Sequence, residues 1–302
     1  MDDLERVAEA RRRMDDALGG GTLLPAVRED LRLVVAMLDN AAYTEDVGNR
    51  LHAVAAELSR LAGWLAYDSE QPALAQCYFL AAVRAAHVSG DRAIGANILG
   101  FMGVQAAQSA SPGDAVTLVE SALRAERELT PAVAGSLYGR LAVGAAHAGD
   151  ATASQRAQDR AFELLARSVP ENEPPWIYWF TEADAQGLAG WSLLALGRPD
   201  EAEPYLRRAV ALLDPTFTRD RAGMLCDLAI ARVGAGAVER ACATAGEAAS
   251  IIRRLNSPRE QRLLADFRRA AAPYARSAAV REFDAKYRDL LVSPAWTGSP
   301  SQ

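Results

Sequence analysis

The chain has few of the residues that build metal sites and disulfide frameworks. Among its 302 residues there are three cysteines, Cys77, Cys226 and Cys242, and no two of them form a CxxC pair. The three histidines show no HxxxH or HxH spacing, and no glycine-rich phosphate loop is present. Zinc and nucleotide sites depend on such patterns. The sequence therefore predicts no metal, no cofactor and no disulfide framework, and unpaired cysteines fit a reducing cytoplasm.

Long apolar runs and basic clusters are also missing. No stretch approaches the roughly 20 apolar residues of a membrane span, and the N-terminal MDDLERVAEARRRMDD is charged throughout. The net charge is -6, the single lysine is Lys286, and the tightest basic run is Arg11 to Arg13. A protein that neutralises DNA phosphates needs a basic face. We therefore expect a cytoplasmic protein that neither enters membranes nor binds nucleic acid directly.

Alternating apolar runs, the pattern of strands, do not occur, whereas alanine, leucine and arginine dominate. This composition favours an all-α protein. In residues 58–86, Gly63 is followed by Ala75 after twelve residues and by Phe79 after four more. Two antiparallel helices approach closely where a small residue on one faces a large residue on the other. The spacing is typical of the tetratricopeptide hairpin.

The same steps recur four more times and predict five helical hairpins. The alanines at one equivalent position are Ala82, Ala122, Ala161, Ala209 and Ala248, which are 40, 39, 48 and 39 residues apart. Hairpins repeated in this way stack into a right-handed, tetratricopeptide-like solenoid. We expect capping helices or a homodimer surface in residues 1–45, repeats in 46–256, capping helices in 257–292 and a disordered tail in 293–302.

Two helix starts agree with this division. Thr130 before Pro131 is an N-cap followed by proline at the first helical position. Ser257, with Glu260 three residues later, predicts a capping box at the start of the first closing helix.

The extra length between the third and fourth repeats falls on residues 169–180, VPENEPPWIYWF. Trp176, Tyr178, Trp179 and Phe180 lie within five residues of each other. Successive helical residues point 100° apart, so these side chains cannot all share one buried stripe. Two interpretations remain open: the aromatic residues pack this joint, or some of them form the wall of a ligand site.

The run from Tyr43 to Asp91 resembles the helical-repeat half of large actinobacterial transcription regulators that carry an Xre-type helix-turn-helix domain. The likeness extends along nearly the whole chain and includes the segments AELSRLAGWLAYD, PPWIYWF and LGRPDEAEPYLRRAV. It implies that the repeats sense a ligand and dimerise. The DNA-reading domain of that family would precede Asp2 and is missing from this sequence, so DNA binding is not carried over.

In a tetratricopeptide stack the first helices line a concave groove. The candidate groove residues are Arg60, Trp64, Tyr67, Asn97, Gln108, His147, Asp184 and Trp191. Indoles, a phenol and an arginine suit an extended peptide or an amphipathic small molecule with a carboxylate. The sequence thus predicts a non-enzymatic regulatory or adaptor protein that binds a peptide, a small molecule or a partner protein. The alternative is a biosynthetic enzyme or peptide chaperone on the same scaffold, and no residue is predicted to be catalytic.

Overall fold

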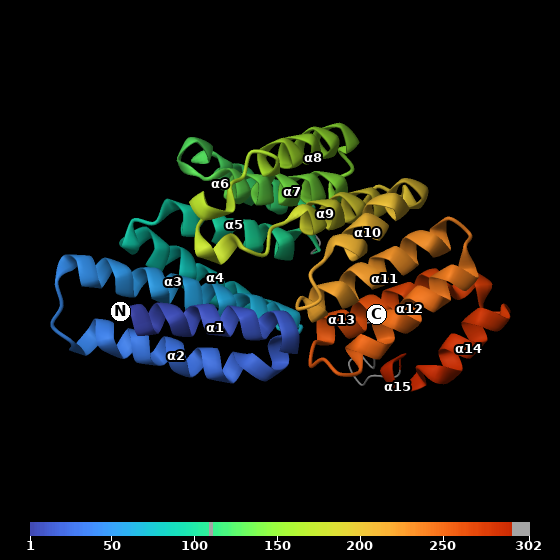
Figure 1. Cartoon of the computed structure of the whole chain (residues 1–302), viewed down its shortest axis with the longest axis horizontal. Coiled ribbons are helices and arrows are strands. Elements are labelled where there is room, and N and C mark those ends of the chain that lie inside the picture. The colour runs from blue at the N-terminus through green and yellow to red at the C-terminus, as the bar shows by residue number, and fades with distance from the viewer. Residues whose placement is uncertain (109–110, 292–302) are drawn as a thin grey trace, which may run out of the picture.

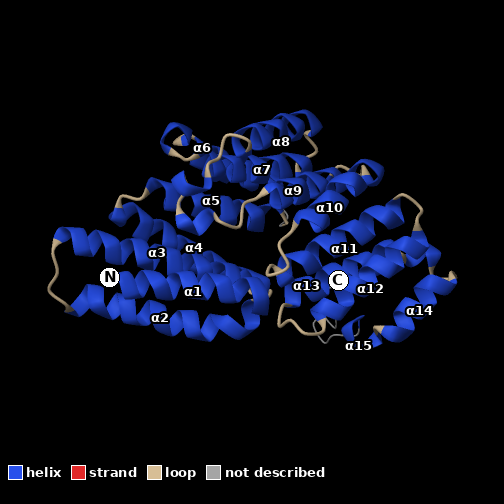
Figure 2. Cartoon of the chain, in the orientation of Figure 1, coloured by secondary structure: helices blue, strands red, loops and turns tan. Residues whose placement is uncertain are grey.

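The computed structural model describes residues 1–108 and 111–291, and most of these residues are helical (Figure 2). Within that part of the chain no residue belongs to a β-strand. Together with the five helical hairpins described next, this confirms the predicted all-α, tetratricopeptide-like fold class. The tail predicted at 293–302 lies outside the described residues.

The predicted hairpins are all present. They are α3 (Glu45–Asp68) with α4 (Pro72–Ser89), α5 (Arg92–Ala107) with α6 (Pro112–Leu123), α7 (Pro131–His147) with α8 (Ala151–Leu165), α9 (Glu182–Ala195) with α10 (Pro199–Leu212), and α11 (Thr218–Gly234) with α12 (Val238–Ile252). The chain begins with α1 (Asp2–Leu18) and α2 (Gly20–Asn40), and α13 (Pro258–Ala270), α14 (Ala278–Lys286) and α15 (Arg288–Leu291) follow the hairpins. Short 3-10 helices are η1 (Glu126–Glu128), η2 (Pro170–Asn172), η3 (Pro175–Ile177) and η4 (Ala272–Tyr274).

The two helices of a hairpin pack closely where a glycine of the first meets a large side chain of the second. A Cβ atom placed on Gly63 would lie 2.6 Å from the ring of Phe79, and one on Gly103 would lie 2.6 Å from Val119. Such distances leave no room for a side chain. The glycine and its large partner are the pair that the twelve- and four-residue steps predict.

The two predicted helix caps differ from the structure in part. Thr130 precedes α7, but its hydroxyl makes no capping hydrogen bond; Glu173 of the joint accepts one of 2.9 Å from a first-turn amide instead. Ser257 does cap α13, because its hydroxyl accepts a hydrogen bond from the amide of Glu260. The predicted capping box is not closed, since the Glu260 carboxylate lies 2.6 Å from the guanidinium of Arg259.

The stack of hairpins curves until its ends meet (Figure 1). Helix α1 contacts α11, and α3 contacts α13, although these helices lie at opposite ends of the sequence. The solenoid is therefore a closed ring. Helices of the two segments in which capping helices were predicted, residues 1–45 and 257–291, join those ends to each other.

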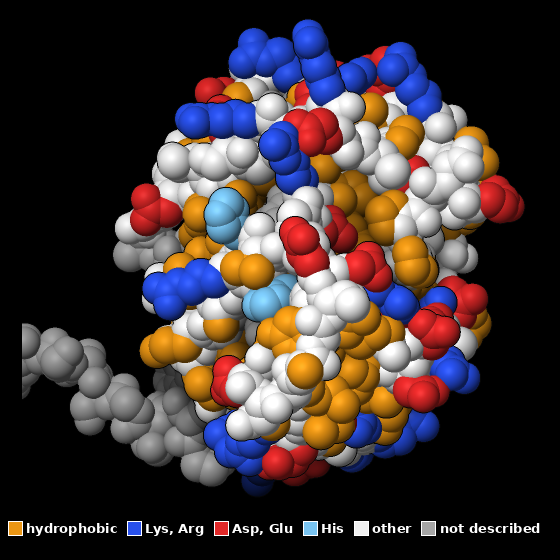
Figure 3. All heavy atoms as spheres, turned by 90° about the vertical axis from the view of Figure 1, so that its left-hand side faces the viewer, with side chains coloured by type: hydrophobic (Ala, Val, Ile, Leu, Met, Phe, Trp, Pro, Cys, Tyr) orange, Lys and Arg blue, Asp and Glu red, His pale blue; other side chains and the backbone are white. Residues whose placement is uncertain are grey.

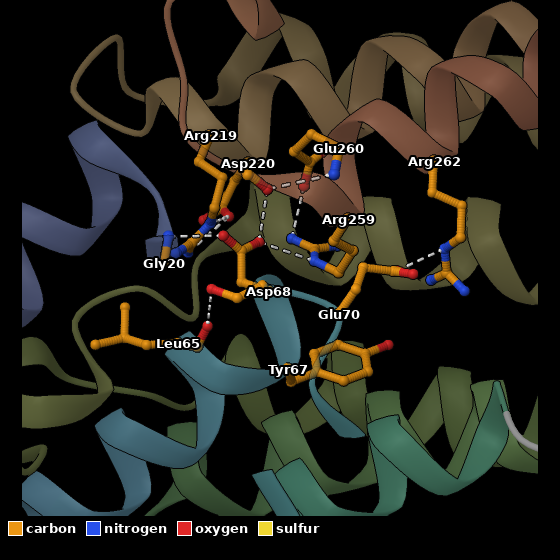
Figure 4. Close-up of polar contacts among 12 residues, drawn as sticks. Gly20, Leu65, Tyr67, Asp68, Glu70, Arg219, Asp220, Arg259, Glu260 and Arg262 are labelled. Atoms are coloured by element: carbon orange, nitrogen blue, oxygen red, sulfur yellow. Dashed lines mark hydrogen bonds and ion pairs between the residues drawn. The ribbon is translucent and has the colours of Figure 1, made fainter. Parts of the chain in front are cut away.

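A buried carboxylate lies at the centre of this contact, which we call the ring closure (Figure 4). Asp68, which is 0% exposed at the end of α3, accepts hydrogen bonds from the Gly20 amide (2.7 Å) and the Ser257 hydroxyl (2.9 Å). It also accepts one of 3.1 Å from Nε of Arg259. Gly20 has no room for a side chain, because a Cβ there would lie 2.5 Å from the carbonyl oxygen of Leu65. One carboxylate thus holds α2, α3 and α13 together.

The molecular surface carries charges of both signs. Figure 3 shows acidic and basic side chains interspersed around the end of the molecule that includes α2, with apolar side chains between them. On α2, Leu33, Val35 and Met37 are exposed. In residues 1–108 and 111–291, no helix has both the length and the hydrophobicity needed to span a membrane. A homodimer surface within residues 1–45 stays a prediction.

Candidate functional site

The inside of the ring holds a chamber of about 210 Å³. The first helix of every hairpin contributes to its wall, as do α1, α13 and the joint between α8 and α9. Its lining comprises Arg12, Asp15, Asp16, Arg60, Leu61, Trp64, Phe101, Val104, Arg140, Tyr178, Trp179, Asp184, Gly187, Leu188, Trp191, Arg219, Asp220, Gly223, Met224, Asp227, Arg259, Glu260 and Leu263. Segments between Arg12 and Leu263, far apart in the sequence, therefore form one site.

Aromatic rings form part of the chamber wall. Phe101 of α5 lies 5.3 Å from Trp64 and 6.1 Å from Trp179, measured between ring centroids. Trp191 stands apart from this group and contacts His147 edge to face at 5.9 Å. A ligand in the chamber would meet aromatic surface on more than one side.

In the joint between α8 and α9, some aromatic residues pack the joint and others line the chamber. Trp176 and Phe180 are buried in the core and pack the joint. Tyr178 and Trp179 line the chamber, and the Tyr178 hydroxyl donates a hydrogen bond of 2.6 Å to Asp16. This bond links the joint to α1 across the ring.

Most of the chamber's arginines are paired with carboxylates. Arg219 of α11 lies 2.5 Å from Asp15 and 3.0 Å from Asp220. Arg259 contacts Asp68 and Glu260, and Arg12 contacts Glu57. Arg219 and Arg259 therefore belong both to the chamber wall and to the contacts that close the ring.

Two arginines have no such partner. Arg60 of α3 is 7% exposed, and Arg140 of α7 is 5% exposed. Burial lowers the pKa of Arg60 to about 10 and that of Arg140 to about 9. A guanidinium still carries its charge at neutral pH under these conditions. The chamber wall therefore holds two buried positive charges that no carboxylate of the described chain contacts within 4 Å.

Several chamber carboxylates are also held away from water. Burial raises the pKa of Asp184, Asp227 and Glu260 to about 7 in each case. Asp184 accepts hydrogen bonds from the Thr181 amide and hydroxyl, and so closes a capping box at the start of α9. The side chain of Asp227 has no hydrogen bond or ion pair with any described residue. These groups are thus close to changing charge at neutral pH.

The structure places four of the predicted groove residues in the chamber wall: Arg60, Trp64, Asp184 and Trp191. The other four support it from outside. Tyr67 and Gln108 belong to the contact between α3, α5 and α13, because the Gln108 amide oxygen accepts hydrogen bonds from Tyr67 (2.6 Å) and from Arg262 (2.9 Å). Asn97 accepts a hydrogen bond of 3.2 Å from Arg140, and His147 contacts the ring of Trp191 without lining the chamber itself.

Sequence reasoning missed Arg140 and the contributions of α1 and α13. A signal for Arg140 does exist, because it is the only charged side chain among the small and apolar residues of α7, PAVAGSLYGRLAVGAAH. No comparable signal marks Asp15 and Asp16. Charged pairs in a short helix usually face solvent, and only the closed ring buries this pair.

Comparison with known proteins bears on the fold. No protein-family model and no curated protein matches the chain. The fold is shared with a Rap protein. The crystal structure of that protein complexed with competence and sporulation factor matches with a TM-score of 0.55 and 13% sequence identity, over 94% of this chain and 87% of that chain. An identity this low shows a common architecture alone, so the function has to be inferred from the residues of the site.

The raised pKa of Asp227 predicts a pH-dependent stability. The unfolded carboxyl has a pKa near 3.8, whereas the folded one ionises at about 7. Between these values only the folded state keeps the proton, so the contribution of Asp227 to stability falls as the pH rises toward 7. We expect Asp227→Asn to raise the melting temperature by about 5 °C or more at pH 8 and by less than half as much at pH 5, because the penalty for ionising the buried carboxyl grows from pH 3.8 up to about pH 7. Melting curves of the exposed control Glu247→Gln should match the unaltered protein at both pH values; an equal effect of Asp227→Asn at pH 5 and 8 would contradict the argument.

Proposed function

We propose that this protein is a non-enzymatic receptor that binds a short peptide or a metabolite of similar size in the central chamber and has a regulatory role. The observation that carries the proposal is the chamber itself, whose wall includes the first helix of all five hairpins. A wall of indoles, apolar side chains and a few polar groups is the usual composition of a ligand site.

The side chains that an enzyme would need are poorly placed. Cys226 is 0% exposed and is not part of the chamber wall, and burial raises its thiol pKa well above the usual value. A buried, protonated thiol is a weak nucleophile. His147 is not part of the chamber wall, and burial lowers its pKa. The described residues contain no group of three or more His, Cys, Asp or Glu side chains suited to a metal ion. These placements favour binding over turnover.

The size of the chamber limits the ligand. Its volume of about 210 Å³ is below the roughly 300–1,000 Å³ of sites for drug-sized molecules. The closed ring therefore suits a ligand of about two or three amino-acid residues better than a long extended peptide. The Rap structure, a complex with competence and sporulation factor, supports a binding role for this architecture.

A regulatory role has its own support. Arg219 and Arg259 line the chamber and also make the ion pairs that join the ends of the ring. A ligand in contact with either guanidinium changes the balance of forces at the ring closure. The resemblance to the repeat half of Xre-type regulators agrees with this role.

Equilibrium dialysis against an equimolar mixture of dipeptides and tripeptides tests the proposal. We expect mass spectrometry to find a subset retained by the protein and recovered chemically unchanged after long incubation. Gly187→Leu provides the control. This residue lines the chamber, and a larger side chain there would displace Met224, another residue of the wall, whose Cε would lie 3.1 Å from a Cβ atom placed on the glycine. Retention should be lost in this variant while its circular dichroism is kept. Peptides returned cleaved or modified would establish the enzyme alternative, and a lack of retention would reject a receptor for ligands of this class.

A further inference from the structure

The chamber's two unpaired guanidinium groups lie against the same aromatic ring. The Cζ atom of Arg60 is 4.9 Å from the ring centroid of Phe101, and that of Arg140 is 4.2 Å from it. Arg140 also lies 4.9 Å from the ring of Trp179. Residues of α3 and α7 thus bring two positive charges together at one aromatic group of α5.

Helix α5 holds Arg140 in this position. Asn97 accepts hydrogen bonds from Nη1 of Arg140 through its side-chain oxygen (3.2 Å) and its backbone carbonyl (3.5 Å). Gly100 leaves room for the guanidinium, since a Cβ atom there would collide with Nη1. The side chain of Arg140 therefore comes from one repeat and is held by another. The residues that hold it lie close together on α5: Asn97, Gly100 and Phe101.

Arg60 has no polar partner at all in the described parts of the chain, residues 1–108 and 111–291. Arg60 lies against the ring of Phe101, and the carboxylates of Asp15 and Asp16 attract its charge from a longer distance. Asp15 is already paired with Arg219, and Asp16 accepts the Tyr178 hydroxyl. No nitrogen of Arg60 is among the fully buried side-chain atoms that lack a partner, so the guanidinium reaches the space of the chamber. Contact with the aromatic face of Phe101 stabilises its charge in part. Such a group is expected where a ligand supplies the missing anion.

We propose that Arg60 and Arg140 form a subsite for a single carboxylate of the ligand, bound between the two guanidinium groups beside the Phe101 ring at the wall of the chamber. This inference rests on the proposed function and names the chemical class of its ligand. Guanidinium groups recognise carboxylates through paired N–H donors. The remainder of the ligand extends along apolar wall residues such as Val104, Leu188 and Met224.

Carboxylates near the subsite reduce its attraction for highly charged anions. Asp15 and Asp16 act on Arg60, and Asp184 acts on Arg140, at a distance that affects the pKa of each arginine. These carboxylates offset part of the attraction of the two guanidinium groups, and they repel a dianion more strongly than a monoanion. We expect the subsite to take ligands with one negative charge, either the C-terminus of a short peptide or a small carboxylic acid, and competition by phosphate tests this expectation.

Matched acids and amides test the subsite and separate the two sources. The probes are the mixture of dipeptides and tripeptides with free C-termini, the same mixture amidated, and the pair 3-phenylpropionate and 3-phenylpropionamide. We expect at least one acid to bind at least tenfold more tightly than its amide. Preference for the peptide acids identifies a C-terminus as the ligand group, and preference confined to 3-phenylpropionate identifies a small acid. Inorganic phosphate should compete poorly.

The variants Arg60→Met and Arg140→Met should each abolish the acid preference. Arg160→Met, at an arginine that pairs with Glu126 and Glu163 on the outer helices, is the control and should keep it. Removing an uncompensated buried charge should not lower the urea midpoint of Arg60→Met, whereas a purely structural role predicts a lower midpoint. Equal retention of acids and amides, with both lost in Gly187→Leu, would refute the carboxylate subsite and leave the receptor standing; no retention of any probe would reject both.

Discussion

Replacing Asp68 by alanine is expected to reduce the free energy of unfolding by about 3–5 kcal/mol, the loss typical of a buried ion pair that is deprived of one partner. The substitution removes the acceptor shared by the Gly20 amide, the Ser257 hydroxyl and Nε of Arg259. Each of these donors is then left without that acceptor in the interior. Urea unfolding followed by circular dichroism measures the loss.

A change of shape should accompany the lost stability. Because Asp68 joins α2 and α3 to α13, its removal should allow the ring to open, and small-angle X-ray scattering should report a larger radius of gyration. Asp68→Asn keeps an oxygen that can accept a hydrogen bond. Its stability and radius of gyration should therefore lie between those of the unaltered protein and those of Asp68→Ala. The control is Glu201→Ala, which breaks an exposed pair with Arg198 and should change stability by less than about 1 kcal/mol. An unaltered urea midpoint for Asp68→Ala would show that the ends of the ring are held together by other contacts.

The sequence predicted the repeats well because the hairpin depends on local spacing. Gly63 and Phe79 touch because they stand at fixed positions in two adjacent helices, and the chain between them is a short turn. The order of small and large residues is then sufficient to define the contact. The same logic correctly paired Gly103 with Val119.

The closed ring was beyond this reasoning. Asp68 and Arg259 are 191 residues apart, and no periodicity relates them. Asp68 reads as the last residue of a helix followed by a turn, and Arg259 as one of many exposed arginines. Their meeting depends on the small rotation between successive hairpins summed over the whole stack, a quantity that no short motif reveals.

The candidate site was predicted only in part, because the sequence pattern identifies the first helices but does not show that the ring closes. Arg60, Trp64 and Trp191 were found because they lie on first helices, near the small residues that define the groove. Tyr67 and Gln108 satisfy the same rule, but the approach of α13 engages them in the contact with Arg262. The chamber's far wall, which includes Glu260, comes from segments outside the repeats.

The structure also separates the two indoles that the sequence treated alike. Trp64 lies 5.3 Å from the guanidinium of Arg219 and 5.2 Å from that of Arg259, so it supports the ring closure as well as the chamber. Trp191 has no cation over its ring in the described residues, and its nearest aromatic neighbour is His147. Trp64→Ala should therefore reduce the free energy of unfolding by about 3 kcal/mol. Weaker binding in that variant would combine the loss of a chamber side chain with a weakened ring closure.

Trp191→Ala is the cleaner test of the chamber, and we expect it to weaken binding of the retained peptide or acid about thirtyfold, equivalent to about 2 kcal/mol for a buried aromatic anchor. Its stability should fall by only about 1 kcal/mol, because the indole is half-buried and packs on small residues of the cluster around Ala107 and Val143. Isothermal titration with the tightest acid from the dialysis experiment measures the change. Trp191→Phe should recover most of the affinity, and Tyr274→Ala, which removes an exposed aromatic side chain on η4, should have no effect. If Trp191→Ala binds as tightly as the unaltered protein while Trp64→Ala does not, the ligand occupies only the arginine side of the chamber, and Trp191 is a packing residue of the hairpin stack.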